Sequence, residues 1–374
     1  MSLRIAGMGW VTPLGRGIDE VWNSLLRGDE ARAEKLSDRV SKKKYSAFPV
    51  RHDLLKDLPP HPRLRRASAI SRFAAAAGLD ALAAAKSTLG AIDLERTALV
   101  FAVSNGGVVY TKRFYHDIVE SGAQSASPLL FPETVFNAPA SHLAAIVGIV
   151  GTSYTLVGDG AVGLLAIKMA ADLINAGAID SCLVIAAEEA DWILCDAYQK
   201  WRLLKAEPPI EPFRKPPRGT ILSEGAGAVL LARGGRVRID AIHAGANFTQ
   251  RNEAGKIIAA IMAELQPEES ITVGSANGTF VDLAELEAGI GQDESYVYSP
   301  KPALGESVGA SALWQIIVAA QILRTQRTPP LLHTEEARTR TPAAPFRDAL
   351  VLSCGLNQQV AGLRMSVQAG HREE

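Results

Sequence analysis

The sequence predicts an α/β fold in which helices cover a mainly parallel sheet. Short apolar runs rich in β-branched residues alternate with longer stretches rich in alanine and leucine along the 374 residues. Strands separated by segments of helix length favour parallel pairing, because a parallel connection has to cross the sheet. A hydrophobic share of 47% and a charged share of 21% are typical of a folded chain with a sizeable core.

The strands are predicted from short runs of aliphatic and β-branched residues. They cover Arg4–Met8, Thr97–Val103, Ser153–Gly158, Ser181–Ala187, Gly227–Ala232, Val237–Gly245, Ile271–Ala276, Asp348–Cys354 and Ala361–Val367. The helices are predicted over Arg66–Ala85, Ala140–Gly148, Ala161–Gly177, Asn252–Leu265, Asp282–Ile290 and Ser311–Gln326. The second part of the chain repeats the strand–helix–strand order of the first, which predicts two similar halves, 1–234 and 235–374. The proline- and charge-rich segment Glu207–Gly219 is interpreted as an ordered surface excursion.

Composition excludes several classes of function. A net charge of -1 gives no overall field that would attract nucleic acid or anionic lipid. The cysteines and histidines form no CxxC, HxH or HExxH pattern, so neither a metal site nor a disulfide framework is expected. Because no GxGxxG or phosphate-loop motif occurs, no cofactor is expected either. The sequence shows no leader and no apolar run of membrane-spanning length, which predicts a cytoplasmic protein.

The segment Thr155–Ile167 is predicted to form a buried strand, a tight turn and an apolar helix. In many α/β enzymes such an elbow holds a nucleophile. Here the tip runs Gly-Asp-Gly-Ala from position 158 and has no serine, cysteine or threonine. Cys354 ends a C-terminal strand where a cleft could form, but a buried structural thiol is the favoured interpretation. His142, in an apolar helix, is interpreted as a core or interface residue.

Three segments carry a family resemblance. Arg4–Asp29, Phe131–Gly158 and Pro212–Arg233 resemble, in the correct order, the opening, the interface segment and the Gly-Glu-Gly-Ala-Gly signature of β-ketoacyl-acyl carrier protein synthases. The match covers nearly the whole chain, which is identified as a member of this family. The resemblance implies a thiolase fold, with two similar halves in a five-layer αβαβα arrangement. It also implies dimers formed through a central strand of each subunit.

The family's chemistry requires a cysteine at the start of a helix, two histidines and a lysine. Registered on matching glycines, the alignment places Gly160 at the cysteine, Asn277 and Glu306 at the histidines, and Lys301 at the retained lysine. Glycine has no side chain to acylate, asparagine cannot become an imidazolium, and glutamate has the wrong sign to stabilise an anion. No catalytic residue is therefore expected. A salt bridge from Lys301 to Glu306 or Asp159 is the structural use expected for these charges.

The family's C-terminal gate, Ser-Phe-Gly-Phe-Gly-Gly, is also altered. Cys354 and Leu356 replace its phenylalanines, and residues 357–358 are Asn-Gln instead of Gly-Gly. These changes place Asp159, Cys354 and Leu356 around the former pocket. A second hypothesis follows, in which Asp159, Cys354 or Glu306 supports malonyl decarboxylation, acyl transfer or other thioester chemistry.

The leading hypothesis is a partner subunit of the chain-length-factor type. In type II polyketide, aryl-polyene and fatty-acid-like pathways, such a chain resembles a ketosynthase, lacks the cysteine and closes the acyl tunnel of an active ketosynthase. The interface and tunnel are then expected to involve Phe131, Phe136, Asn137, His142 and the strand Tyr154–Val157. A homodimer with the same residues in its core remains open.

Carrier protein and acyl chain are the further partners that the resemblance implies. The basic residues Arg63, Arg65 and Arg66, together with Lys42–Lys44, could meet an acidic carrier protein. Solvated surface charge is the favoured interpretation of this cluster. A stand-alone acyl-binding or carrier-docking module is a third hypothesis that has no positive feature beyond the fold.

Overall fold

The strands of the chain pair in one large mixed sheet and one small sheet. The computed structural model describes residues 2–38, 42–266, 270–291, 296–334 and 345–367. The strands are β1 (Arg4–Thr12), β2 (Gly15–Arg16), β3 (Glu34–Ser37), β4 (Lys44–Phe48), β5 (Thr97–Val103), β6 (Ser153–Val157), β7 (Ser181–Glu188), β8 (Leu222–Ser223), β9 (Gly225–Ala232), β10 (Val237–Ile242), β11 (Ala246–Asn247), β12 (Ile271–Val273), β13 (Tyr296–Tyr298), β14 (Asp348–Cys354) and β15 (Gln359–Val367). The large sheet runs in the order β13-β12-β14-β15-β10-β1-β9-β7-β5-β6, and β3, β4 and β8 form the small one.

Helices cover both faces of the large sheet. The α-helices are α1 (Ile18–Arg27), α2 (Ala69–Leu89), α3 (Val108–Ser121), α4 (Ala138–Val147), α5 (Val162–Asn175), α6 (Trp192–Lys200), α7 (Ala254–Leu265), α8 (Phe280–Glu287), α9 (Lys301–Leu304) and α10 (Ser311–Thr325). Short 3-10 turns are η1 (His52–Leu55), η2 (Pro62–Leu64), η3 (Ala123–Ser125), η4 (Phe131–Thr134) and η5 (Arg251–Glu253). Within the described ranges, none of these helices combines the length and apolar content that a bilayer crossing needs.

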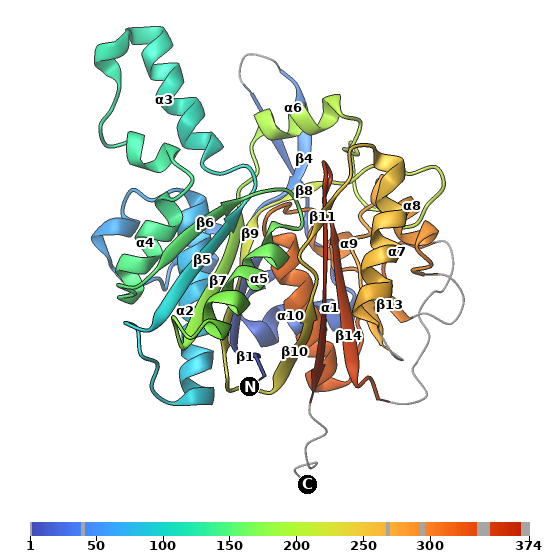
Figure 1. Cartoon of the computed structure of the whole chain (residues 1–374). Coiled ribbons are helices and arrows are strands. Elements are labelled where there is room, and N and C mark those ends of the chain that lie inside the picture. Colours follow the sequence, from blue (N-terminus) through green and yellow to red (C-terminus); the bar gives the residue numbers. More distant parts are fainter. Residues whose placement is uncertain (1, 39–41, 267–269, 292–295, 335–344, 368–374) are drawn as a thin grey trace.

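The layers follow the order expected from the sequence. Helix α2 packs on β1, β7 and β9, whereas α5 packs on the opposite side against β5 and β7. Helix α10 contacts α5 and packs against β12 and β14, and α7 covers β14 and β15 from outside. Figure 1 shows α5 and α10 in the middle of the molecule, with α2 and α4 on one side and α7 and α8 on the other. Helices α5 and α10 therefore lie between two parts of the one large sheet, and the layers are helix, first part of the sheet, helices, second part of the sheet, helix.

Close packing of α2 on β1 depends on two glycines. A Cβ atom on Gly7 would lie 2.1 Å from the carbonyl oxygen of Ala81, and one on Gly9 would lie 2.2 Å from that of Ala77. Glycine on one face of the strand and alanine on the facing helix bring the two backbones together. This contact anchors the first half of the sheet, whose central strands β5, β7 and β9 are buried along their whole length.

Residues on both sides of the expected boundary contribute to one continuous sheet, because β1 pairs with β10. The expected boundary at residue 234 falls between β9 and β10. Division into two similar halves remains a prediction. The expected surface excursion at 207–219 carries no helix or strand and is ordered by ion pairs around Glu211.

Helix α3 was not predicted from the sequence. None of its residues is buried, and it projects away from the body of the protein (Figure 1). Its apolar residues do recur at helical spacing, as at Tyr115, Ile118 and Val119, so the pattern was present in the sequence and was missed. The small sheet was missed as well, because β3 and β8 are short and β3 is largely exposed.

Candidate functional site

The elbow forms where β6 ends and α5 begins. Gly160 lies at its tip, outside the left-handed backbone region, so the backbone would admit any residue there. Space is the constraint: a Cβ on Gly160 would lie 3.0 Å from the Cα of Gly355. The hydroxyl of Ser353 also donates to the Gly160 carbonyl over 2.9 Å. The end of β14 therefore covers the tip directly.

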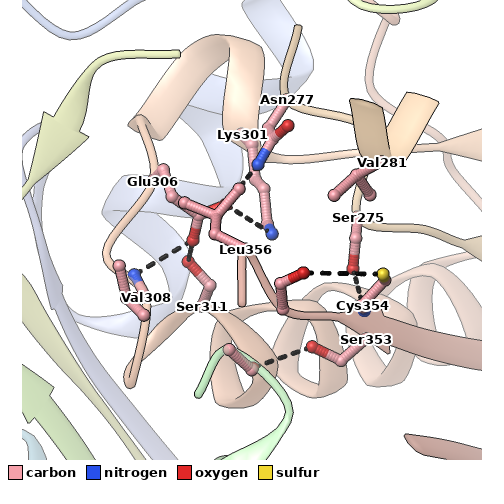
Figure 2. Close-up of polar contacts among 12 residues, drawn as sticks. Ser275, Asn277, Val281, Lys301, Glu306, Val308, Ser311, Ser353, Cys354 and Leu356 are labelled. Atoms are coloured by element: carbon pink, nitrogen blue, oxygen red, sulfur yellow. Dashed lines mark hydrogen bonds and ion pairs between the residues drawn. The ribbon is translucent and has the colours of Figure 1, made fainter. Parts of the chain in front are cut away.

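Glu306 is the centre of a polar network near this elbow. Its Oε2 accepts hydrogen bonds from the Nζ of Lys301 and the Nδ2 of Asn277, both over 2.7 Å. Its Oε1 accepts from the backbone N–H of Val308 over 3.0 Å and from the hydroxyl of Ser311 over 2.8 Å. Figure 2 shows this network. Asn277, Lys301 and Glu306 are each 2% exposed or less, so the ion pair is fully desolvated.

The expected salt bridge is thus present, and Glu306 is its acid. Asp159 instead accepts from backbone amides of residues 356–358, over 3.2, 2.8 and 2.9 Å. The oxygens of both carboxylates, Glu306 and Asp159, already accept hydrogen bonds from groups within the fold. Neither is left free to act as a general base.

Asn277 is held by a second buried acid that sequence reasoning missed. Asp282 accepts from the backbone amides of Asn277 over 2.7 Å and Phe213 over 2.7 Å. Burial raises the pKa of Asp282 to about 6, although these amide donors lower it. The pair Asp282 and Glu285, one turn apart in an otherwise apolar run, was the sequence signal for it. Asp282 therefore fixes the turn that presents Asn277.

Cys354 lies at the end of β14 with its thiol buried. Burial raises the pKa of this thiol, and nearby Glu285 raises it further, so the thiol stays protonated and a poor nucleophile. Leu356 is 4% exposed and its backbone N–H donates to Asp159. Among the described residues, no group of histidine, cysteine or acidic side chains could hold a metal ion.

The structure therefore brings together Gly160, Asp159, Asn277, Lys301, Glu306, Cys354 and Leu356. Within this group, the Asn277–Lys301–Glu306 network contains one cation and one anion in direct contact. None of the described residues that form hydrogen bonds in this network is a histidine. A neutral, saturated pair offers no net positive charge to a developing enolate. Its geometry is suited to holding α9, α10 and the turn before α8 together.

A further buried acid, which no sequence pattern indicated, lies at the end of β7. Glu188 accepts from the backbone amides of Ser104 and Asn105, where β5 ends. Burial raises the pKa of Glu188 to about 8, and that of the adjacent Glu189 also to about 8. The carboxyl ends of the parallel strands are thus lined with acids rather than with a nucleophile and its base.

The expected interface residues gather elsewhere, around α3, η4 and α4. Phe131 is 55% exposed and contacts Phe114 at 5.8 Å between ring centres, while Phe136 is 44% exposed. His142 forms a hydrogen bond with Glu133. Burial raises the pKa of Glu133, but the bond from His142 and others lower it by more, so that the pKa is lowered overall. Asn137 is exposed just before α4. These residues do not contact the Glu306 network.

The basic cluster is exposed to solvent. Arg63, Arg65 and Arg66 lie on the surface around η2. Across the small sheet, Lys43 pairs with Asp196 over 2.6 Å. These features agree with the interpretation of the cluster as solvated charge.

The comparisons with solved structures identify the fold. The ishigamide ketosynthase/chain length factor superposes with a TM-score of 0.85 at 18% identity, covering 98% of this chain and 99% of that one. A ketosynthase in complex with its chain length factor from Xenorhabdus doucetiae gives a TM-score of 0.80 at 16% identity, covering 98% of each chain. The fold is thus the thiolase-like α/β fold of ketosynthases.

The family follows from the sequence matches. The family model of the beta-ketoacyl synthase N-terminal domain matches residues 2–235. The 3-oxoacyl-[acyl-carrier-protein] synthase 2 of Vibrio cholerae is 23% identical over 366 residues, which cover 88% of each chain. The chain belongs to the β-ketoacyl synthase family.

Removing Glu306 should destabilise the fold strongly. Glu306→Ala leaves the ammonium of Lys301 buried without a partner, which costs about 3–5 kcal/mol of unfolding free energy. Chemical denaturation measures this loss, and Lys301→Met in the same background should recover part of it. Asp172→Ala, which breaks the exposed pair with Lys168, is the matched control and should cost below about 1 kcal/mol. A loss as small as the control's for Glu306→Ala would contradict the structure.

Glu188 should make stability fall as pH rises. Its folded pKa is about 8, well above the value of about 4.3 in an unfolded chain. Between about pH 5 and 8 the unfolded chain therefore holds fewer protons, and unfolding free energy decreases by up to about 1.4 kcal/mol per pH unit. Glu188→Gln should flatten this slope in denaturation curves measured across the window. Glu253→Gln, whose acid has a lowered pKa, should stay parallel to wild type there; identical slopes for wild type and Glu188→Gln would contradict the assignment.

Proposed function

We propose that this chain is a non-condensing partner of an active ketosynthase, of the chain-length-factor type. In this role it would shape the acyl tunnel at the dimer interface in a type II polyketide, aryl-polyene or fatty-acid-like pathway. The observation that carries the proposal is the elbow with Gly160 at its tip, above a closed Asn277–Lys301–Glu306 network. A ketosynthase scaffold is retained while the positions of its chemistry are filled by structural bonds.

The alternative chemistry receives less support from the geometry. Decarboxylation or acyl transfer would need Asp159, Cys354 or Glu306 to be accessible and in a reactive protonation state. Each of the three is 7% exposed or less, the two acids are hydrogen-bonded within the fold, and the thiol is protonated. The partner role needs none of these groups to react.

An unpartnered apolar surface supports an interface along β6. This strand lies at the end of the large sheet and pairs only with β5 among the described strands. Val157 on β6 is 53% exposed and Tyr154 is 41% exposed. Tyr115 and Val119 on α3 and Phe131 on η4 are further exposed apolar side chains. An edge strand with exposed apolar side chains beside it is a template for pairing with another chain.

Active ketosynthase is the occupant that we propose for this surface. Two of the solved structures that superpose on this chain are a ketosynthase with a chain length factor, by their own descriptions. Condensation requires a nucleophile, so a chain that lacks one can take part only together with a subunit that supplies it. Phe136 packs on the Gly106 turn at the end of β5, because a Cβ on Gly106 would meet its ring at 2.5 Å. This exposed ring is the side chain that we propose to border both the interface and the partner's tunnel.

Assembly should depend on the partner. Expressed alone, the chain should form homodimers poorly or aggregate, whereas co-expression with the ketosynthase of its own gene cluster should give a stable 1:1 complex by size-exclusion chromatography with light scattering. Val157→Asp should weaken the complex by at least about tenfold, because a buried unpaired charge costs more than about 1.4 kcal/mol. Ile193→Asp, at an exposed site on α6, should leave it intact. A tight homodimer that ignores the ketosynthase would overturn the proposal.

Product length should respond to Phe136. In the complex, Phe136→Ala removes the ring from the proposed tunnel wall, and the products measured by mass spectrometry should become longer. Trp201→Ala is the matched control, since this aromatic residue is 53% exposed at the end of α6. Unchanged product length in an intact Phe136→Ala complex would show that Phe136 belongs only to the dimer core.

A further inference from the structure

The loop between β14 and β15, residues 355–358, is tied to the elbow by a single carboxylate. Asp159 Oδ1 accepts from the N–H of Leu356 over 3.2 Å. Its Oδ2 accepts from the N–H of Asn357 over 2.8 Å, Gln358 over 2.9 Å and Gln359 over 3.4 Å. Four consecutive backbone donors thus converge on one side chain that lies about 200 positions away in the sequence.

The connection is reciprocal. The backbone N–H of Asp159 donates to the Oε1 of Gln359 over 2.8 Å, while the N–H of Gln359 donates to the Asp159 carboxylate. Within the loop, the N–H of Gly355 donates to the Gln359 carbonyl over 2.7 Å. The loop is therefore closed on itself and bonded to the elbow from both sides.

Asp159 is buried, and its charge is balanced mainly by peptide dipoles. It is 7% exposed, and no lysine or arginine in the described ranges forms an ion pair with it. Hydrogen bonds to an ionised acceptor are roughly twice as strong as neutral ones. Removing the carboxylate would leave the loop amides without partners, so the loop would be expected to leave its present position.

Contact between loop and elbow leaves no room for a side chain on Gly355 and little room for one on Gly160. A Cβ on Gly355 would lie 1.9 Å from the Asp159 carboxylate, and one on Gly160 would lie 3.0 Å from the Gly355 Cα. The two backbones therefore meet directly over the elbow tip. Any thioester approaching that tip would have to displace residues 354–355.

We propose that Asp159 is a positioning residue that fastens the 355–358 loop over Gly160 and closes this chain's own pocket to thioester substrates. Closure would leave the pocket of the partner subunit as the one that accepts an acyl chain. The inference deepens the proposed function and rests on it only for this last consequence. Loop position itself is a property of this chain, and it can be measured whether or not a ketosynthase binds.

Two readouts on the full-length chain, alone or in its complex, test this assignment. Asp159→Ala should speed hydrogen exchange of the amides of residues 356–359 by at least about tenfold, since each lost bond to a charged group is worth about 1.5–3 kcal/mol. Asp159→Asn keeps one acceptor oxygen and should give an intermediate acceleration. Asp180→Ala, which removes a surface pair with Arg96, is the control and should leave these amides unchanged.

The thiols separate loop opening from general destabilisation. Cys354 directly precedes the loop, and Cys182 and Cys195 are buried in β7 and α6. In Asp159→Ala a small alkylating reagent should modify Cys354 selectively, at least about tenfold faster than in wild type if the closed state is favoured by about 1.4 kcal/mol or more. Equal acceleration at all three thiols would mean that Asp159 only stabilises the fold. Unchanged exchange and unchanged Cys354 labelling would overturn the proposal without bearing on whether the chain pairs with a ketosynthase.

Discussion

The buried contact between Glu306 and Lys301 is the constraint on which the rest of the site depends. An ammonium that is 1% exposed requires an acid in contact with it, and Glu306 supplies that acid over 2.7 Å. The same residue joins the small sheet through its backbone, donating to Ile221 and accepting from Ser223. Its carboxylate also holds the N–H of Val308, a β-branched residue in the left-handed region with φ of 38°. One side chain thus fixes the entry to α10 and the place of Asn277.

Under the proposed function, a site organised in this way serves stability rather than reaction. Condensing chemistry needs a thiolate and donors that face a developing anion. Here the donors already bind Glu306 and Asp159, and the elbow tip has no side chain. The exposed apolar side chains lie instead on the edge strand β6 and on α3, where another chain could bind. The proposed partner role connects these two features, since a closed interior and an open edge are what a supporting subunit needs.

Much of the fold could be predicted from the sequence, because the central strands and helices have strong signals. The predicted strand Thr97–Val103 coincides with β5, and helix α10 was placed within one residue of its end. Local motifs also placed Gly160, Asn277 and Glu306 in one region, and the salt bridge of Lys301 was foreseen. Contacts between distant, chemically ordinary positions could not be predicted. The bonds from Asp159 to the 355–358 loop and from Glu188 to the end of β5 carry no local pattern.

Under the proposed function, this chain assists condensation without carrying the acyl group itself. The most direct test is the intact mass of each subunit after the 1:1 complex has been incubated with an acyl-carrier-protein thioester. An acyl adduct is expected on the ketosynthase alone, with the mass of this chain unchanged. An adduct on this chain, or release of carbon dioxide from malonyl carrier protein by this chain without a ketosynthase, would contradict it.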